Sequence, residues 1–320
     1  MARSDLLIDF VEAEQHGDRA RFRALVEAAI AEERAKSHHL VAERLSDLIT
    51  TVGLADRPGR DSAAAFVKDL LLEVVPQRRL LDLTLAPSVC GAISELIEEH
   101  HRGELLRSHN LEPRHRVLLA GPPGNGKTSI AEAIAAETLL PMYVARYEGL
   151  VSSYLGESAS RLDEAFEFSR TRRCVLFFDE FDTIAKERAD EHETGEIKRV
   201  VSTLLLQIDR LPAHVIVVCA TNHGELLDRA AWRRFQLRLS IEAPTRATAT
   251  EFLNKIARRL GGELGYAPRT LAEHLQGASF AELEEFAVDV RRRYVLGLPD
   301  ADLRAIAKDK ITQWQKQARS

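Results

Sequence analysis

The chain has 320 residues, of which 45% are hydrophobic and 29% are charged, and its formal net charge is −5 at pH 7. A chain of this length and composition folds into one large or two to three ordinary globular domains. The acidic balance disfavours partners that bind through their own negative charge, such as nucleic acids.

Cysteine content and hydropathy restrict where the protein works. The three cysteines, Cys90, Cys174 and Cys219, lie far apart without metal-binding spacing, which suits a reducing compartment. The longest uncharged apolar runs, such as residues 215–220, are too short to span a bilayer. Acidic residues interrupt the apolar N-terminus, which is not typical of a signal peptide. We therefore expect a cytoplasmic protein with no membrane segment.

The first 55 residues have the periodicity of helices. Asp18 can cap a helix whose apolar residues recur at helical spacing, and Ser37 can cap another. Such amphipathic helices form either a small bundle that packs on a main domain or a recruitment module for a substrate or partner, and the pattern does not separate the two. Residues 56–82 are predicted to be a linker, because Gly, Pro, Asp and Arg concentrate at residues 53–65.

Apolar strands alternate with helices in the next predicted domain, residues 83–244. Pro87 suits the first position of a helix that runs towards Ser108. Continuous apolar strands separated by helices are typical of a parallel sheet that helices cover on both faces. The predicted strands are residues 117–120, 142–145, 174–178, 215–219 and 237–241.

The segment from Arg116 to Ser129, RVLLAGPPGNGKTS, reads as a strand, a glycine-rich loop and a helix that begins at Lys127. It fits the P-loop pattern in the strand–loop–helix context that the pattern requires. In such a loop, backbone N–H groups and the helix N-terminus bind nucleotide phosphates. Lys127 would reach the β- and γ-phosphates, and Thr128 would bind Mg²⁺. The predicted nucleotide-binding residues are Gly121, Pro122, Pro123, Gly124, Asn125, Gly126, Lys127 and Thr128.

Two later strands end in polar residues. VLFFDEFD, residues 175–182, ends in adjacent carboxylates about 50 residues after the P-loop, and at the carboxyl end of a parallel strand these face the same crevice. We expect Asp179 to hold Mg²⁺, directly or through water, and Glu180 to polarise the water that attacks the γ-phosphate. The strand VIVVCATN ends at Asn222, whose amide can bind the γ-phosphate and the attacking water. A turn asparagine is the alternative.

The remaining residues, 245–320, have only helical periodicity. Gly261, Gly277 and Gly297 punctuate a predicted four-helix lid, in which SFAE at residues 279–282 forms a capping box. The predicted fold class is therefore α/β. It comprises a P-loop parallel sheet covered by helices, a small helical lid after it and a helical segment before it.

The order and spacing of GPPGNGKT, VLFFDEFD and ATN resemble the AAA group of the AAA+ ATPases, over about residues 83–296. The resemblance implies ATP and Mg²⁺ as cofactors and a homo-oligomeric ring, usually a hexamer. LLDRAAWRRF resembles the family's second region of homology, whose arginine fingers reach the next subunit's site. Arg234, directly before Phe235, is the better candidate finger, and Arg233 is the other. The family often separates its two arginines and follows the Phe with Asp, whereas Gln236 follows here.

Two further stretches resemble this family. GASFAEL, residues 277–283, is similar to its lid motif and has Ala281 where other AAA+ branches place an arginine. Tyr154-Leu155-Gly156 looks like the aromatic–hydrophobic–Gly pore loop of AAA unfoldases, which lines the axis of the ring and grips a polypeptide. A tyrosine packed in its own domain is the alternative, but the flanking polar residues are poor surroundings for a core residue.

The resemblance implies an ATP hydrolase that unfolds, threads or disassembles a protein substrate, with a separately encoded protease as a candidate partner. The chain itself contains no His-Glu-x-x-His protease motif. Two alternatives stay open. One is a nucleic-acid helper ATPase, which salt-sensitive DNA binding would support. The other is a nucleotide-gated binding scaffold, in which hydrolysis only times assembly with a partner.

Overall fold

The computed structural model describes residues 70–145, 155–181, 203–227 and 229–317. Residues 66–320 belong to one compact unit. The predicted helical module at residues 1–55 and Tyr154 of the predicted pore loop lie outside the described residues.

A six-stranded sheet forms the centre of the fold, with the strand order β1-β3-β4-β5-β2-β6. All neighbouring strands run parallel except β1, which pairs antiparallel with β3 at one edge. The strands are β1 (Leu71–Val74), β2 (Arg116–Ala120), β3 (Met142–Ala145), β4 (Cys174–Phe178), β5 (Val215–Thr221) and β6 (Leu237–Ser240).

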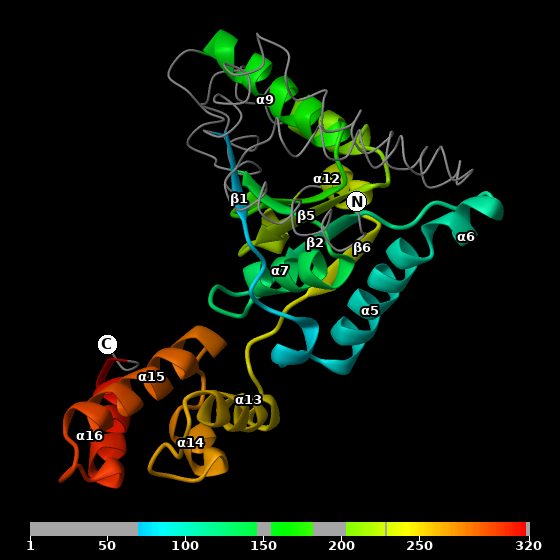
Figure 1. Cartoon of the computed structure of the whole chain (residues 1–320). Helices are drawn as coiled ribbons and strands as arrows, with labels where there is room; N and C mark the ends of the chain where they lie inside the picture. Colours follow the sequence, from blue (N-terminus) through cyan, green and yellow to red (C-terminus); the bar gives the residue numbers. More distant parts are fainter. Residues whose placement is uncertain (1–69, 146–154, 182–202, 228, 318–320) are drawn as a thin grey trace, which may run out of the picture. The chain divides into compact units, whose positions relative to one another are not determined.

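Helices cover both faces of this sheet (Figure 1). On one face, alternate strand residues pack with α5 (Pro87–His101) and α7 (Lys127–Thr138) around buried side chains such as Ile93 and Ile134. On the other face, the intervening strand residues pack with α9 (Leu155–Arg170) and α12 (Arg229–Arg234) around Phe166 and Phe235. Because both faces are buried, the central strands are continuously apolar, as predicted.

The five predicted strands are confirmed, with ends that differ by at most two residues. β1 differs from the prediction, because it lies in the stretch interpreted as linker, as does the short 3-10 helix η1 (Leu80–Asp82). Leu71 of β1 is buried, whereas Leu72 and Glu73 are exposed. A four-residue edge strand with one partner carries too short a pattern to be detected from sequence. The predicted helix from Pro87 to Ser108 is divided, since α5 ends at His101 and α6 covers Gly103–Ser108.

The C-terminal helices form the predicted four-helix lid. They are α13 (Arg246–Arg259), α14 (Pro268–His274), α15 (Phe280–Leu296) and α16 (Leu303–Gln317). Their apolar stripes meet in a separate core that includes Leu253, Leu271, Phe286 and Val290. The capping box is confirmed, because Ser279 accepts from the backbone N–H of Glu282, whose carboxylate accepts from the backbone N–H of Ser279.

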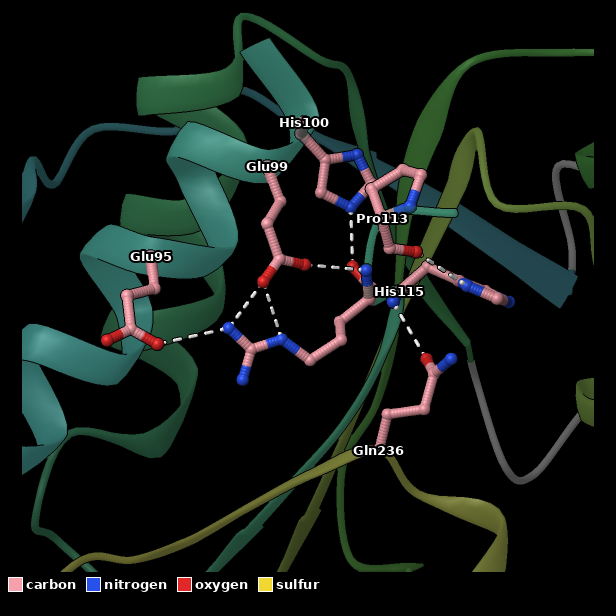
Figure 2. Close-up of polar contacts among 7 residues, drawn as sticks. Glu95, Glu99, His100, Pro113, His115 and Gln236 are labelled. Carbon is pink, nitrogen blue, oxygen red and sulfur yellow. Dashed lines mark hydrogen bonds and ion pairs between the residues drawn. The ribbon is translucent and has the colours of Figure 1, made fainter. Parts of the chain in front are cut away.

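A polar network ties α5 to the starts of β2 and β6, at the sheet edge opposite the P-loop (Figure 2). Arg114 donates from its backbone N–H and its guanidinium to Glu99, at 2.8 and 2.7 Å. Its carbonyl lies 2.7 Å from His100 Nε2. Gln236 Oε1 accepts from the backbone N–H groups of His115 and Arg116, at 2.9 and 3.1 Å. The residue that departs from the family pattern therefore anchors the start of the P-loop strand.

Two histidines make this network sensitive to pH. Burial lowers the pKa of His100 and of His115 below the usual range of histidine, although hydrogen bonds to backbone carbonyls oppose the shift. As pH falls below about 6.5, histidines in the unfolded chain bind protons that the folded protein takes up only at lower pH. The free energy of unfolding therefore falls through this window. Glu99 titrates below this pH window, because burial raises the pKa of its carboxyl group but the hydrogen bonds and charge of Arg114 outweigh burial and lower it.

We expect the melting temperature to fall between pH 7 and pH 5.5, by roughly 2–4 °C for each kcal/mol lost. His100→Gln, which retains a donor for the Arg114 carbonyl, should flatten this dependence in thermal melts. His101→Gln, at an exposed position on the same helix, is the matched control and should retain the wild-type slope. An unchanged slope in His100→Gln would contradict the assignment.

Within the described ranges, no helix is both long enough and apolar enough to cross a bilayer.

Candidate active site

A cavity of about 340 Å³ opens beside the P-loop. Its walls come from the segment between β1 and α5, from the P-loop and the carboxyl ends of β4 and β5, and from lid helices α13 and α15. Most of the predicted site residues meet here. Those that line the cavity are Pro123, Gly124, Asn125, Gly126, Lys127, Thr128, Asp179, Glu180 and Asn222.

Two glycines of the P-loop stand where no side chain fits. A Cβ at Gly121 would lie 1.9 Å from the carbonyl oxygen of Ile241, which follows β6. A Cβ at Gly124 would lie 2.8 Å from Ser279 Oγ, and the backbone φ of Gly124 is +74°. The P-loop therefore packs against the end of β6 on one side and against the start of α15 on another. Its residues 123–128 line the cavity.

Lys127 joins the P-loop to the end of β5. It is the first residue of α7 and only 6% exposed. Its Nζ donates to the carbonyl oxygens of Gly121 and Pro122, at 2.7 and 3.0 Å, and to Asn222 Oδ1 at 2.7 Å. Because these acceptors orient the ammonium at the cavity wall, Lys127 can bind a phosphate there without first ordering a flexible side chain.

Asn222 comes directly after β5, as predicted. Since its side-chain oxygen accepts from Lys127, its NH₂ group is the part that can donate to a phosphate oxygen or a water molecule. This geometry suits the phosphate-binding interpretation of Asn222 better than a role confined to a turn.

The two carboxylates lie next to Thr128 at the end of β4. Thr128 Oγ1 donates to Asp179 Oδ2 at 3.4 Å, and Asp179 Oδ1 accepts from the backbone N–H of Glu180 at 2.9 Å. Glu180 has a φ of +49°, a left-handed conformation that is unfavourable for a side chain with a Cβ. Such conformations concentrate at functional sites, and this one places the carboxylate of Glu180 at the cavity wall beside that of Asp179.

The oxygen donors at this point fit Mg²⁺. Thr128 and Asp179 supply one hydroxyl and one carboxylate, and Mg²⁺ in phosphoryl-transfer sites takes one or two protein oxygens and completes its octahedron with phosphate and water. Within the described residues, no group of three or more His, Cys, Asp or Glu side chains could hold a metal by itself. A cation held here would neutralise phosphate charge.

The apolar part of the cavity wall suits the base of a nucleotide, and sequence reasoning missed its residues. Leu83 and Leu85 contribute to it from the segment before α5, and Phe252 and Phe280 contribute from the lid, with ring centroids 4.8 Å apart. Thr84 Oγ1 is buried there and has no hydrogen-bond partner within the described part of the chain. An apolar slot with one unsatisfied hydroxyl fits a flat base that carries donors and acceptors.

The lid contacts the P-loop directly. The backbone N–H of Ala281 donates to the carbonyl of Gly124 at 2.9 Å, and that of Phe280 to Asn125 Oδ1 at 3.4 Å. These donors belong to the first turn of α15, whose N–H groups have no partner inside the helix. The contacts couple the position of the lid to the loop expected to hold the phosphates.

Neither of the candidate arginine fingers, Arg233 and Arg234, lines the cavity. Arg234 donates to the carbonyl of Leu205 at 2.9 Å and pairs with Asp209, which also pairs with Arg116 at 2.8 Å. Arg233 is exposed.

Only part of the predicted pore loop can be placed. Leu155 and Gly156 begin helix α9 instead of continuing a loop, and Tyr154 lies outside the described residues. Because β3 is parallel to β4, its carboxyl end lies at the same sheet edge as the P-loop, and the connection to α9 starts there.

Comparisons with known proteins agree with this site. The model of the family described as "ATPase family associated with various cellular activities (AAA)" matches residues 117–243. The chain is 33% identical over 302 residues to the uncharacterized AAA family ATPase y4kL of Sinorhizobium fredii, a match that covers 92% of this chain and 90% of that protein.

Two other relatives match a smaller part. A cell division cycle protein 48 homolog of Archaeoglobus fulgidus is 37% identical over 212 residues, which are 63% of this chain and 28% of that protein. A proteasome-activating nucleotidase of Thermococcus onnurineus is 34% identical over 206 residues, which are 60% of this chain and 52% of that protein. Since the P-loop, the acidic end of β4 and Asn222 meet at one cavity, and since one match spans nearly the whole chain, this protein belongs to the AAA family of ATPases and is an ATP hydrolase.

Proposed function

We propose that this ATPase couples hydrolysis to the unfolding, threading or disassembly of a protein substrate as a cytoplasmic homo-oligomeric ring, with a hexamer as the expected form. The carrying observation is the aromatic–hydrophobic–Gly sequence at residues 154–156, whose last two residues begin α9 after the connection that leaves β3 at the sheet edge of the nucleotide site. The name of one relative, the proteasome-activating nucleotidase, supports this kind of work and makes a separate protease a candidate partner.

Each residue at the cavity has a distinct role in this proposal. Lys127 and the P-loop N–H groups bind the phosphates of ATP, and Thr128 and Asp179 hold Mg²⁺, which supplies charge neutralisation when bound. Glu180 accepts a proton from the attacking water as general base. Asn222 orients that water and the γ-phosphate.

The ring is part of the proposal because the cavity lacks an arginine from α12. Charge that develops on the transferring phosphoryl group is stabilised in many NTPases by an arginine supplied by a neighbouring molecule. Arg233 and Arg234 lie outside their own subunit's cavity, so a finger from α12 would have to act on the adjacent subunit.

Tyr154 provides the direct test. If its ring grips substrate in an axial pore, Tyr154→Ala should abolish substrate remodelling while ATP turnover without substrate stays within a few-fold. Tyr154→Phe and Tyr154→Trp should retain most of the remodelling, because the grip depends on the aromatic face. A Glu180→Gln variant, which should hold ATP and substrate together, is first used to identify a substrate by capture. Remodelling of that substrate, carrying a fluorescent reporter, is then measured as loss of fluorescence, beside ATP turnover and thermal melting of each variant.

The opposite result is equally distinct. Truncation of a packed core tyrosine costs about 3–5 kcal/mol by analogy with other large aromatic residues. A Tyr154→Ala protein that melts early and loses turnover together with remodelling would therefore reject the pore loop. If the wild-type protein hydrolyses ATP and binds a partner but never remodels it, the protein is a nucleotide-gated scaffold.

A further inference from the structure

The segment at residues 77–85, here called the strap, crosses from β1 to α5 along the nucleotide cavity. It is attached to α7 by two backbone donors. The N–H of Gln77 donates to Glu132 Oε2 at 3.2 Å, and the N–H of Leu80 donates to Glu137 Oε1 at 3.4 Å. Glu132 is one helical turn beyond Thr128 on α7, so the beginning of the strap contacts the helix that follows the P-loop, close to the P-loop threonine in sequence.

The strap is also attached to the lid. Lys255 Nζ of α13 donates to the carbonyl of Leu83 at 2.7 Å. Arg78 of the strap forms an ion pair with Glu284 of α15, at 3.3 Å, and Arg259 of α13 pairs with the same carboxylate. Burial by itself raises the pKa of Glu284, but the hydrogen bond and charge of Arg259, together with those of Arg78, outweigh it and hold the pKa below its usual range. Glu284 is therefore a carboxylate shared between two arginines.

The two arginines differ in one respect that matters for a ligand. Arg78 lines the cavity, as Glu284 does, whereas Arg259 does not. Within the described part of the chain, Arg78 and Lys127 are the cationic side chains at the cavity wall, against the four carboxylates Asp82, Asp179, Glu180 and Glu284. The side chain of Arg78 is 35% exposed, so its guanidinium can move without disturbing the core.

We propose that Arg78 is a nucleotide-binding residue, whose guanidinium exchanges Glu284 for a phosphate of the bound nucleotide. A guanidinium forms strong, forked hydrogen bonds with phosphate, and the phosphate chain of ATP or ADP as a whole carries more negative charge than the single carboxylate of Glu284. After the exchange Glu284 is paired with Arg259 alone. Nucleotide binding therefore removes the ion pair between Arg78 of the strap and Glu284 of α15. This inference rests on the nucleotide site described above and not on the remodelling of a protein substrate.

Nucleotide titrations on the full-length chain test the exchange. Arg78→Ala should weaken binding of fluorescently labelled ATP and ADP by about tenfold, the usual order for one charge-assisted hydrogen bond. Binding of adenosine, which has no phosphate, should be unchanged. Glu284→Gln should tighten ATP binding a few-fold, because it removes the competitor for Arg78 and a negative charge beside the ligand. Thermal melting of each variant reports whether it is folded.

Arg259→Ala is the matched control, because it removes an arginine from the same carboxylate but not from the cavity wall. It should weaken ATP binding clearly less than Arg78→Ala does, because it leaves Glu284 to hold Arg78 more tightly but removes no group that contacts the phosphate. The inference is rejected if Arg259→Ala or Glu284→Gln weakens ATP binding as much as Arg78→Ala does. It is also rejected if Arg78→Ala weakens the binding of adenosine as much as that of ATP. In either case Arg78 only holds the lid. Unchanged ATP binding by Arg78→Ala also rejects it. Failure of the nucleotide site itself is distinct, because Lys127→Ala would then bind ATP like wild type.

Discussion

Lys127→Ala should lose ATP binding, whereas Glu180→Gln should bind ATP normally and turn it over about 10²–10⁴-fold more slowly. Lys127 supplies a buried ammonium at the P-loop, so its loss removes charge from the phosphate site in the ground state. Glu180 acts on water, and its replacement by an amide keeps the shape of the site while removing the base. Nucleotide titration and steady-state phosphate release measure the two effects separately.

Thermal melting must accompany this comparison, because Lys127 also donates to two P-loop carbonyls and to Asn222. A destabilised Lys127→Ala protein would show a lower melting temperature in the absence of nucleotide. Equal loss of ATP affinity in a folded Lys127→Ala and in Glu180→Gln would contradict the division between phosphate binding and general base.

Removing the arginine finger should suppress hydrolysis by roughly 10²-fold or more while each subunit still binds ATP, since the finger stabilises charge that develops only during phosphoryl transfer. Sequence placed Arg234 first, but its side chain is held by Asp209 and by the carbonyl of Leu205, whereas Arg233 is exposed. The structure therefore favours Arg233 as the proposed finger. We expect Arg233→Ala to lose turnover without a change in melting temperature, and Arg234→Ala to lower both.

Mixing experiments decide whether the finger acts between subunits. Arg233→Ala subunits retain a nucleotide site, and Lys127→Ala subunits retain the arginine, so rings that contain both should regain turnover at their shared interfaces. No recovery in rings shown to be mixed would exclude action between subunits. Asp209→Asn is the control for Arg234, because it breaks the ion pairs that Asp209 forms with Arg234 and Arg116 and leaves Arg234 in place. If Arg234 is the finger after all, Asp209→Asn should keep turnover that Arg234→Ala loses.

The sequence alone determined the parts of this protein that depend on local pattern. The P-loop with its strand and helix, the acidic end of β4, the end of β5 at Asn222 and the capping box at Ser279 were all predicted and were found at the expected positions. These features can be predicted from the sequence because buried parallel strands are continuously apolar. Glycines and helix caps also determine the backbone conformation within a few residues of their own position. Their convergence on one cavity also followed, since parallel strands present their carboxyl ends at one edge.

Other features depend on contacts between segments that are far apart in the chain, and these could be seen only in the folded protein. Strand β1 exists because β3 offers it an edge, and four residues carry no pattern of their own. Arg78 belongs to no motif and becomes a cavity residue only because α7 and α15 hold the strap beside the P-loop. Gln236 acts as an anchor for β2, and Arg234 is tied to Asp209, through pairings that span 120 and 25 residues of chain. Side-chain partners at such separations are selected by packing of the whole domain, which local sequence does not encode.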